Sequence, residues 1–135
     1  MTTSLKAGDN MSFRKTLTVA EQAMYTGISG NMAPLHVDQR AAKDAGFDNM
    51  LAFELNGVAL ATTALNRLAG PGWRIAGVQV DFAVPVLVGQ TLESRVEVTA
   101  ADAASITCTL LCQTVGNTGG AVVAQGTARL VPVKA

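Results

Sequence analysis

The chain has 135 residues, 49% of them hydrophobic, and its 10 basic and 10 acidic side chains balance to no formal net charge at pH 7. This size and composition fit one small domain with a single core. Balanced charge disfavours nucleic acid or an anionic membrane surface as the main partner, and every apolar run is too short or too interrupted to span a bilayer.

The first dozen residues are polar and lack the apolar segment of a secretory signal. We therefore expect residues 1–12 to be a flexible N-terminal segment and residues 13–135 to form the only domain. Nothing in the chain indicates a repeat, a linker or a second domain. We expect the protein to be cytoplasmic.

A long helix is predicted in the middle of the chain. Apolar positions recur at helical spacing over residues 55–68, and the other side of this segment is apolar as well, so the helix should be buried nearly all round. Gly70 and Pro71 end it, because glycine can adopt the left-handed C-terminal conformation and proline cannot continue a helix.

Alternating apolar and polar residues predict strands after this helix, at residues 78–82, 92–98, 106–112 and 121–131. Residues 115–120 supply the turn before the last strand, because they are rich in residues that tolerate positive φ. The result is an antiparallel meander that can curl around the one apolar helix. Its open edges predict a homodimer in which the sheets join edge to edge.

The two cysteines, Cys108 and Cys112, share one face of a predicted strand. Four residues of strand separate them by about 13 Å, which is too far for a mutual disulfide. One histidine and two cysteines are also too few to complete a typical metal site. We expect both to be small apolar side chains of the core.

The only histidine, His36, follows a proline in a polar, turn-rich insertion between apolar segments. Imidazole titrates near neutrality and can give or take a proton, so His36 is a candidate general acid or base. The alternative is a histidine that caps a turn or is simply exposed.

The neighbourhood of His36 carries a family resemblance. Residues 30–38 read Gly-Asn-Met-Ala-Pro-Leu-His-Val-Asp and resemble the Gly-Asp-x-Asn-Pro-x-His-x-Asp segment of MaoC-like hydratases and dehydratases, hot-dog-fold enzymes related to (R)-specific enoyl-CoA hydratases. Residues 13–19 look like that family's opening strand and helix start, and residues 78–92 are similar to its strand-turn-strand segment. Pro34 and His36 match the family segment. Asn31 stands where the family has its catalytic Asp, and Ala33 stands where it has Asn.

The resemblance implies an α+β fold, a single hot-dog domain whose antiparallel sheet wraps around one long central helix, in a homodimer. It implies reversible addition of water to a 2-enoyl thioester of coenzyme A or acyl carrier protein, with no metal and no organic cofactor. In such a site an acid-base pair handles the water, and backbone N–H groups at the helix start stabilise the thioester oxygen. The candidate catalytic residues are His36, Asn31 and Glu54, and the candidate substrate-binding residues are Pro34, Phe53, Leu55 and Met32.

Three functions stay open, because an asparagine has no proton to exchange and cannot serve as a base. In the first, His36 performs a slower hydration or dehydration, oriented by Asn31 or by Asp38, although Asp38 is also a typical helix-capping residue. In the second, the protein is a thioesterase, since other hot-dog enzymes that cleave acyl thioesters have an acidic residue near the start of the central helix, resembling Glu54. The third is a non-catalytic binder of acyl-CoA or acyl carrier protein.

Overall fold

The computed structural model describes residues 3–116 and 120–134. Its elements are β1 (Asn10–Thr16), α1 (Val19–Ser29), α2 (Pro34–Val37), α3 (Gln39–Asp44), α4 (Leu55–Ala69), β2 (Trp73–Phe82), β3 (Thr91–Ala101), β4 (Ile106–Val115) and β5 (Val122–Pro132). None of the helices in these residues is long and apolar enough to cross a membrane.

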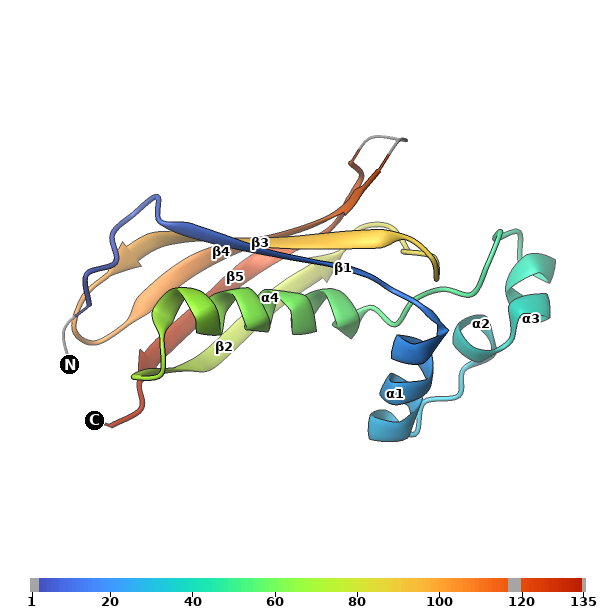
Figure 1. The fold of residues 1–135 in the computed structure, drawn as a ribbon, viewed down its shortest axis with the longest axis horizontal. Helices are drawn as coiled ribbons and strands as arrows, with labels where there is room; N and C mark the ends of the chain where they lie inside the picture. Colours follow the sequence, from blue (N-terminus) through green and yellow to red (C-terminus); the bar gives the residue numbers. More distant parts are fainter. Residues whose placement is uncertain (1–2, 117–119, 135) are drawn as a thin grey trace.

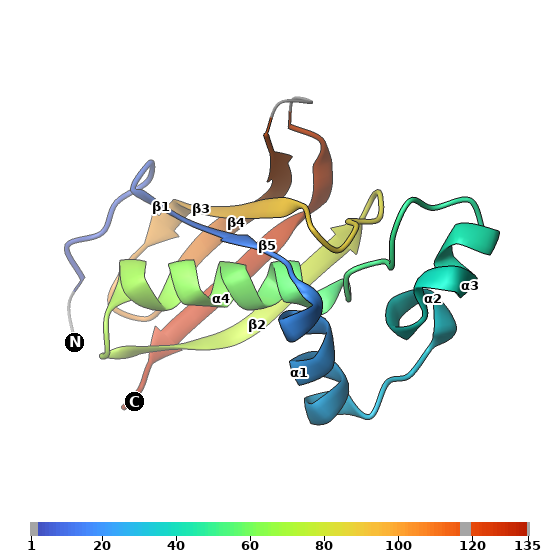
Figure 2. The same cartoon turned by 45° about the vertical axis from the view of Figure 1, so that its right-hand side comes forward.

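The strands form one antiparallel sheet in the order β1-β3-β4-β5-β2. The sheet curls around α4, and α1, α2 and α3 lie together beyond the N-terminal end of that helix (Figures 1 and 2). This is the predicted α+β hot-dog fold. Strands β1 and β2 are its two edges, because each pairs with a single neighbour among the described strands.

The central helix α4 has the predicted position and end. Its buried face packs on the sheet, and Gly57 allows a close approach, because a Cβ built there would lie 3.3 Å from Leu92 Cδ2 and 3.6 Å from Cys112 Sγ. The Gly57 carbonyl oxygen accepts a hydrogen bond from the buried hydroxyl of Ser94 at 2.9 Å. This contact ties the first turn of α4 to the first half of β3.

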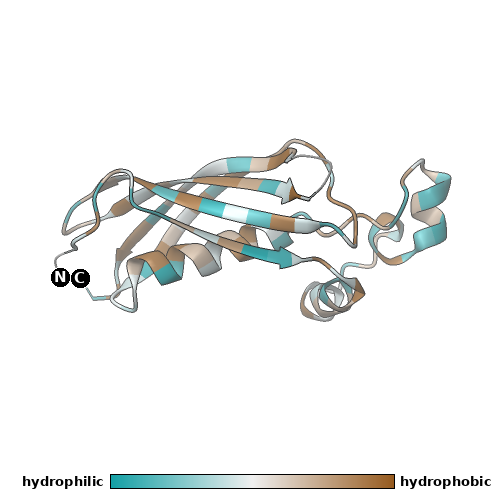
Figure 3. Cartoon of the chain, turned by 45° about the horizontal axis from the view of Figure 1, so that its top comes forward, coloured by the Kyte–Doolittle hydropathy of each residue, from teal (hydrophilic) through white to brown (hydrophobic). Residues whose placement is uncertain are grey.

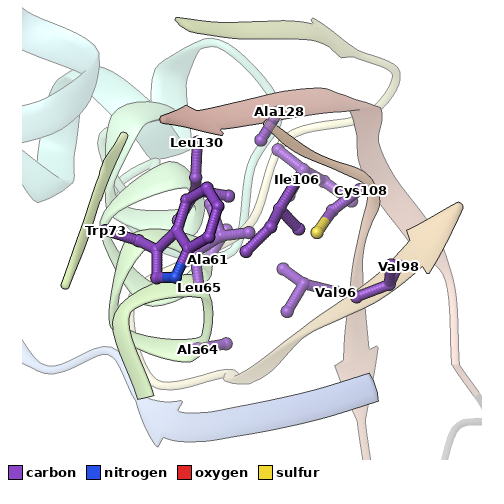
Figure 4. Packing of buried hydrophobic residues seen from close by; sticks show 11 residues of the cluster. Ala61, Ala64, Leu65, Trp73, Val96, Val98, Ile106, Cys108, Ala128 and Leu130 are labelled. Atoms are coloured by element: carbon purple, nitrogen blue, oxygen red, sulfur yellow. The ribbon is translucent and has the colours of Figure 1, made fainter. Parts of the chain in front are cut away.

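The core lies between α4 and the concave face of the sheet, and Figure 4 shows its inner cluster around the Trp73 indole. Teal and brown alternate along the strands in Figure 3, as expected for strands with one buried face. Cys108 and Cys112 are free and buried, as predicted. Loss of solvation raises the pKa of the Cys108 thiol to about 11, so this thiol stays protonated at neutral pH.

Strand β2 begins at Trp73, five positions before the predicted start at residue 78. The register of β2 against β5 shifts between Ile75 and Gly77, and this irregularity breaks the alternation that marks a strand in the sequence. In the rest of β2, apolar and polar residues alternate between the two faces of the sheet as predicted. The predicted turn at residues 115–120 lies in part outside the described residues.

Strand β1 begins at Asn10, so ordered structure starts before the predicted domain boundary at residue 13. The Val98 N–H donates to the Asp9 carbonyl at 2.8 Å, and the Gly8 N–H donates to the Val98 carbonyl at 2.9 Å. Leu5 packs against the core cluster. The flexibility expected of the N-terminal segment stays a prediction.

Candidate active site

The helix α1 is fixed at its start by a capping box. The Thr18 side chain accepts from the Ala20 N–H, and the Glu21 carboxylate accepts from the Thr18 N–H at 2.7 Å. A hydrogen bond from the Thr18 hydroxyl, above all, lowers the pKa of Glu21 to about 2. This fixed start places Gln22 in α1 facing the interior.

His36 lies in the short helix α2, which opens with Pro34, and its side chain is buried. Its Nδ1 lies 2.7 Å from the Leu51 carbonyl oxygen. A carbonyl only accepts hydrogen bonds, so Nδ1 carries the hydrogen, and in the neutral ring Nε2 has the free lone pair. The geometry therefore presents Nε2 as a proton acceptor.

Glu54 is the acidic group nearest to that nitrogen. Its Oε1 lies 3.9 Å from His36 Nε2, and its side chain is about half exposed. Glu54 occupies the N-cap position of α4 and makes no side-chain capping hydrogen bond there. The Asn56 and Gly57 N–H groups of the first turn donate to the Phe53 and Glu54 carbonyls at 3.1 and 3.2 Å, so within the described residues the Leu55 N–H is the donor of this turn that makes no hydrogen bond.

The ring of Phe53 holds one face of the imidazole. The two rings stack with centroids 4.4 Å apart and planes inclined by 20°, and Tyr25 stacks on the other face of Phe53 at 4.3 Å and 21°. Phe53 is almost fully buried. Phe53 is thus part of the frame around His36, and its predicted contact with substrate stays a prediction.

Asn31 and Asp38 serve local structure. The Asn31 Oδ1 accepts from the Ala33 N–H at 3.0 Å, and within the described residues no hydrogen bond joins Asn31 to His36. The Asp38 carboxylate accepts from the Arg40 and Ala41 N–H groups and so caps α3. Asp38, one of the two residues considered as orienting partners of His36, is thus a helix cap.

The site has two hollows beside it. A narrow pocket of about 20 Å³ adjoins Glu54 and Phe53, and its walls are otherwise Gly57 of α4 and mainly apolar side chains from the sheet and the 82–86 segment. An open groove of about 330 Å³ between α1 and α2 is lined by His36, Gln22 and Met32, among others. Met32 is strongly exposed there, whereas Leu55 lines a separate groove against β2, and Pro34 is exposed at the start of α2.

Sequence reasoning missed Gln22. This side chain is 4% exposed, and its amide donates to the carbonyls of His36 and Leu51 at 2.7 and 2.9 Å and accepts from the Phe53 N–H at 3.2 Å. A glutamine in a helix is normally a solvent-facing residue. The sequence signal available was the capping box, which locates Gln22 in α1 but does not say which partners it meets.

The fold and the buried imidazole at the start of the central helix define a hot-dog domain with a candidate acid-base site. Residues 3–128 match the MaoC-like domain family, and the chain belongs to that family. It is 31% identical over 98 residues to the (R)-specific enoyl-CoA hydratase of Aeromonas caviae, covering 72% of this chain and 73% of that protein. It is 28% identical over 96 residues to an (R)-specific enoyl-CoA hydratase of Rhodospirillum rubrum, covering 70% and 67% of the two chains.

Solved structures give the same result. The structure of an (R)-hydratase from A. caviae involved in PHA biosynthesis superposes with a TM-score of 0.88 and 30% sequence identity, over 96% of this chain and 98% of that one. The unliganded R-hydratase PhaJ1 of Pseudomonas aeruginosa superposes with a TM-score of 0.86 at 22% identity, over 95% and 82% of the chains. The second likeness shows the fold alone.

Proposed function

We propose that this protein is a hydratase or dehydratase of acyl thioesters, which adds water to a 2-enoyl thioester or removes it from a 3-hydroxyacyl thioester. The observation that carries the proposal is the geometry of His36. Its imidazole is buried, its Nδ1 is hydrogen-bonded to the Leu51 carbonyl, and its Nε2 lies near Glu54 at the start of α4. The hydratases to which the chain is similar support the same reaction class.

The proposed step needs one base and one group that stabilises negative charge. The Nε2 of His36 takes a proton from water while the water oxygen bonds to C3 of the substrate, and the C2=C3 π electrons shift toward the thioester carbonyl. The Leu55 N–H at the start of α4, which makes no hydrogen bond within the described residues, stabilises the oxygen that becomes negative. The imidazolium then returns its proton to C2, which completes the addition of one water.

Glu54 has a supporting role in this proposal. The distance of 3.9 Å between its Oε1 and His36 Nε2 is too long for a direct hydrogen bond. A water bonded to both atoms is held as the nucleophile, and the carboxylate stabilises the imidazolium once it forms. Asn31 is an amide whose Oδ1 is already bonded to a backbone N–H, so we assign it a part in shaping the loop and no proton transfer.

We propose a homodimer as the working form. The edge strand β2 and the outer side of α4 leave an apolar groove of about 300 Å³ lined by Leu55, Val58, Val78, Val80 and Phe82. Pairing with the β2 edge of a second copy would cover these side chains and the open hydrogen-bonding groups of the strand. Light scattering of the purified protein tests this state directly.

Coenzyme A or the phosphopantetheine of an acyl carrier protein is proposed as the substrate carrier, in the cytoplasm. Acid-base chemistry on a thioester requires no metal or organic cofactor, and none is proposed.

Thioester hydrolysis is the second candidate, and the exposed carboxylate of Glu54 at the mouth of the narrow pocket is the observation that favours it. In this case Glu54 attacks the thioester carbonyl, the C–S bond breaks, and water then hydrolyses the acyl–Glu54 anhydride, or Glu54 activates a water that attacks the carbonyl directly; both routes release a free thiol and a carboxylic acid. A protein that binds acyl-CoA without turnover is the third outcome.

One experiment separates the three functions. The protein is incubated with 2-enoyl-CoA, 3-hydroxyacyl-CoA and saturated acyl-CoA, and enoyl absorbance and free thiol are followed separately. The proposal expects loss of enoyl absorbance from 2-enoyl-CoA and its appearance from 3-hydroxyacyl-CoA, with no thiol. Thiol release from the saturated thioester indicates the thioesterase, and binding with neither signal indicates the non-catalytic protein.

A further inference from the structure

The buried amide of Gln22 connects the segments that form the site. Its Nε2 donates to the His36 carbonyl at 2.7 Å and to the Leu51 carbonyl at 2.9 Å, and its Oε1 accepts from the Phe53 N–H at 3.2 Å. The two carbonyls can only accept and the N–H can only donate, so one orientation of the amide satisfies all three. The amide is therefore locked between α2 and the start of α4.

The same Leu51 carbonyl receives the hydrogen of His36 Nδ1 at 2.7 Å. Gln22 thus holds the acceptor that fixes the imidazole tautomer, and it also holds the backbone of His36 itself. Through Phe53 it holds the residue whose ring stacks on that imidazole. The positions of the His36 side chain, of its backbone and of its stacking partner therefore all depend on one buried amide.

We propose that Gln22 is a positioning residue for His36. It keeps the hydrogen of the neutral imidazole on Nδ1 and the lone pair of Nε2 directed at the start of α4. The catalytic role of His36 rests on the proposed function. The tautomer and the position of its imidazole are structural properties that do not depend on that function. The alternative is a buried amide that only joins α1 to the rest of the domain, which affects stability and leaves the tautomer unchanged.

Two substitutions test this role. Gln22→Leu keeps a similar volume and removes all three hydrogen bonds. Gln22→Glu keeps the shape and replaces the two donors by an oxygen that faces two carbonyl oxygens, so Leu51 and His36 lose their shared anchor. Gln125→Leu is the matched control, because Gln125 is an exposed glutamine of β5.

The chain has one histidine, so long-range ¹H–¹⁵N spectra of the imidazole report on His36 alone. We expect the Nδ1–H tautomer in the wild type and in Gln125→Leu, and a mixture or the Nε2–H tautomer in both Gln22 variants. For hydration of a 2-enoyl-CoA, we expect kcat to fall about ten- to a hundredfold in the Gln22 variants, with KM within about threefold.

The outcomes are decisive in each case. Folded Gln22 variants that keep the wild-type tautomer and kcat overturn the positioning role, even if they melt at a lower temperature. If Gln22→Leu does not fold, Gln22→Glu decides by the same two measurements, and failure of both to fold assigns Gln22 to the stability of the domain and overturns the proposal. A wild type with no hydration overturns the proposed function, while the tautomer of the variants still decides the role of Gln22.

Discussion

The Nε2 of His36 and the Oε1 of Glu54 lie 3.9 Å apart, on one side of an imidazole whose other nitrogen is bonded to the Leu51 carbonyl. One residue comes from the helical insertion and the other from the start of the central helix. Within the described residues, Glu54 is the acidic side chain that approaches this imidazole within 4 Å.

Substitution of Glu54 by glutamine removes the charge and keeps the size of the side chain. If the carboxylate holds water and stabilises the imidazolium, we expect hydration of a 2-enoyl-CoA to fall about tenfold or more. An unchanged hydration rate removes Glu54 from the mechanism. Under the thioesterase alternative, thiol release should instead fall about a hundredfold or more in Glu54→Gln, so both signals are followed in one assay.

Substitution of Asn31 by aspartate places an ionisable group in the loop that approaches His36. If the site retains hydratase geometry, we expect hydration to rise, because acid-base groups contribute about a hundredfold to ten-thousandfold and even partial restoration is measurable. The Ala33 N–H can still donate to the new carboxylate, so the loop should keep its shape. A variant with confirmed fold and unchanged rate counts against an impaired hydratase and favours thioester hydrolysis or acyl binding.

The narrow pocket beside Glu54 leaves room for few carbon atoms. We expect kcat/KM for a four-carbon enoyl-CoA to exceed that for an eight-carbon one by at least about tenfold, because extra methylenes without space are rejected by such factors. Val86→Ala widens the pocket and should reduce this ratio. Val131→Ala, a half-buried valine of β5 that does not line the pocket, is the control. Equal rates for both chain lengths in the wild type contradict this expectation.

The capping box of α1 predicts a pH-dependent contribution to stability. The Thr18 hydrogen bond first of all lowers the pKa of Glu21 from 4.5 to about 2, so the folded state binds this proton less readily than the unfolded state. The stabilisation is complete above pH 4.5 and is lost as pH falls toward 2. We expect Glu21→Gln to cost about 1 kcal/mol at pH 6 and much less at pH 2.5 in urea unfolding.

The exposed Asp44 at the end of α3 provides the control for this measurement. Asp44→Asn should change the unfolding free energy by less than about 0.5 kcal/mol at pH 6. A cost of Glu21→Gln that does not shrink in acid would assign the effect to something other than the ionised carboxylate.

The parts of the fold that sequence predicted are those with a local signal. The central helix has apolar side chains on both sides and a Gly-Pro end, and Asp38 is a typical capping residue at the start of α3. The first half of β2 was missed because the irregularity at Ile75 and Gly77 breaks its alternation. Local pattern is sufficient where each element carries its own periodicity and ends.

The candidate site could be predicted in its residue types and only partly in its contacts. His36 and Glu54 were both named from the sequence, on the resemblance to known enzymes. The stacking of Phe53 and the bonds of Gln22 join segments that are far apart in the chain, and the partners of Gln22 are backbone groups that carry no residue signature. Such contacts exist only once α1 is packed against α2 and the start of α4.

The most direct test of the account is the rate at which a four-carbon 2-enoyl-CoA is hydrated by the wild type and by His36→Ala, with the folding of both checked by thermal melting. The account predicts measurable hydration by the wild type and a loss of at least about a hundredfold in the variant, because Nε2 of His36 is the base. A folded His36→Ala protein with wild-type activity, or a wild type that hydrates no 2-enoyl thioester, would contradict it.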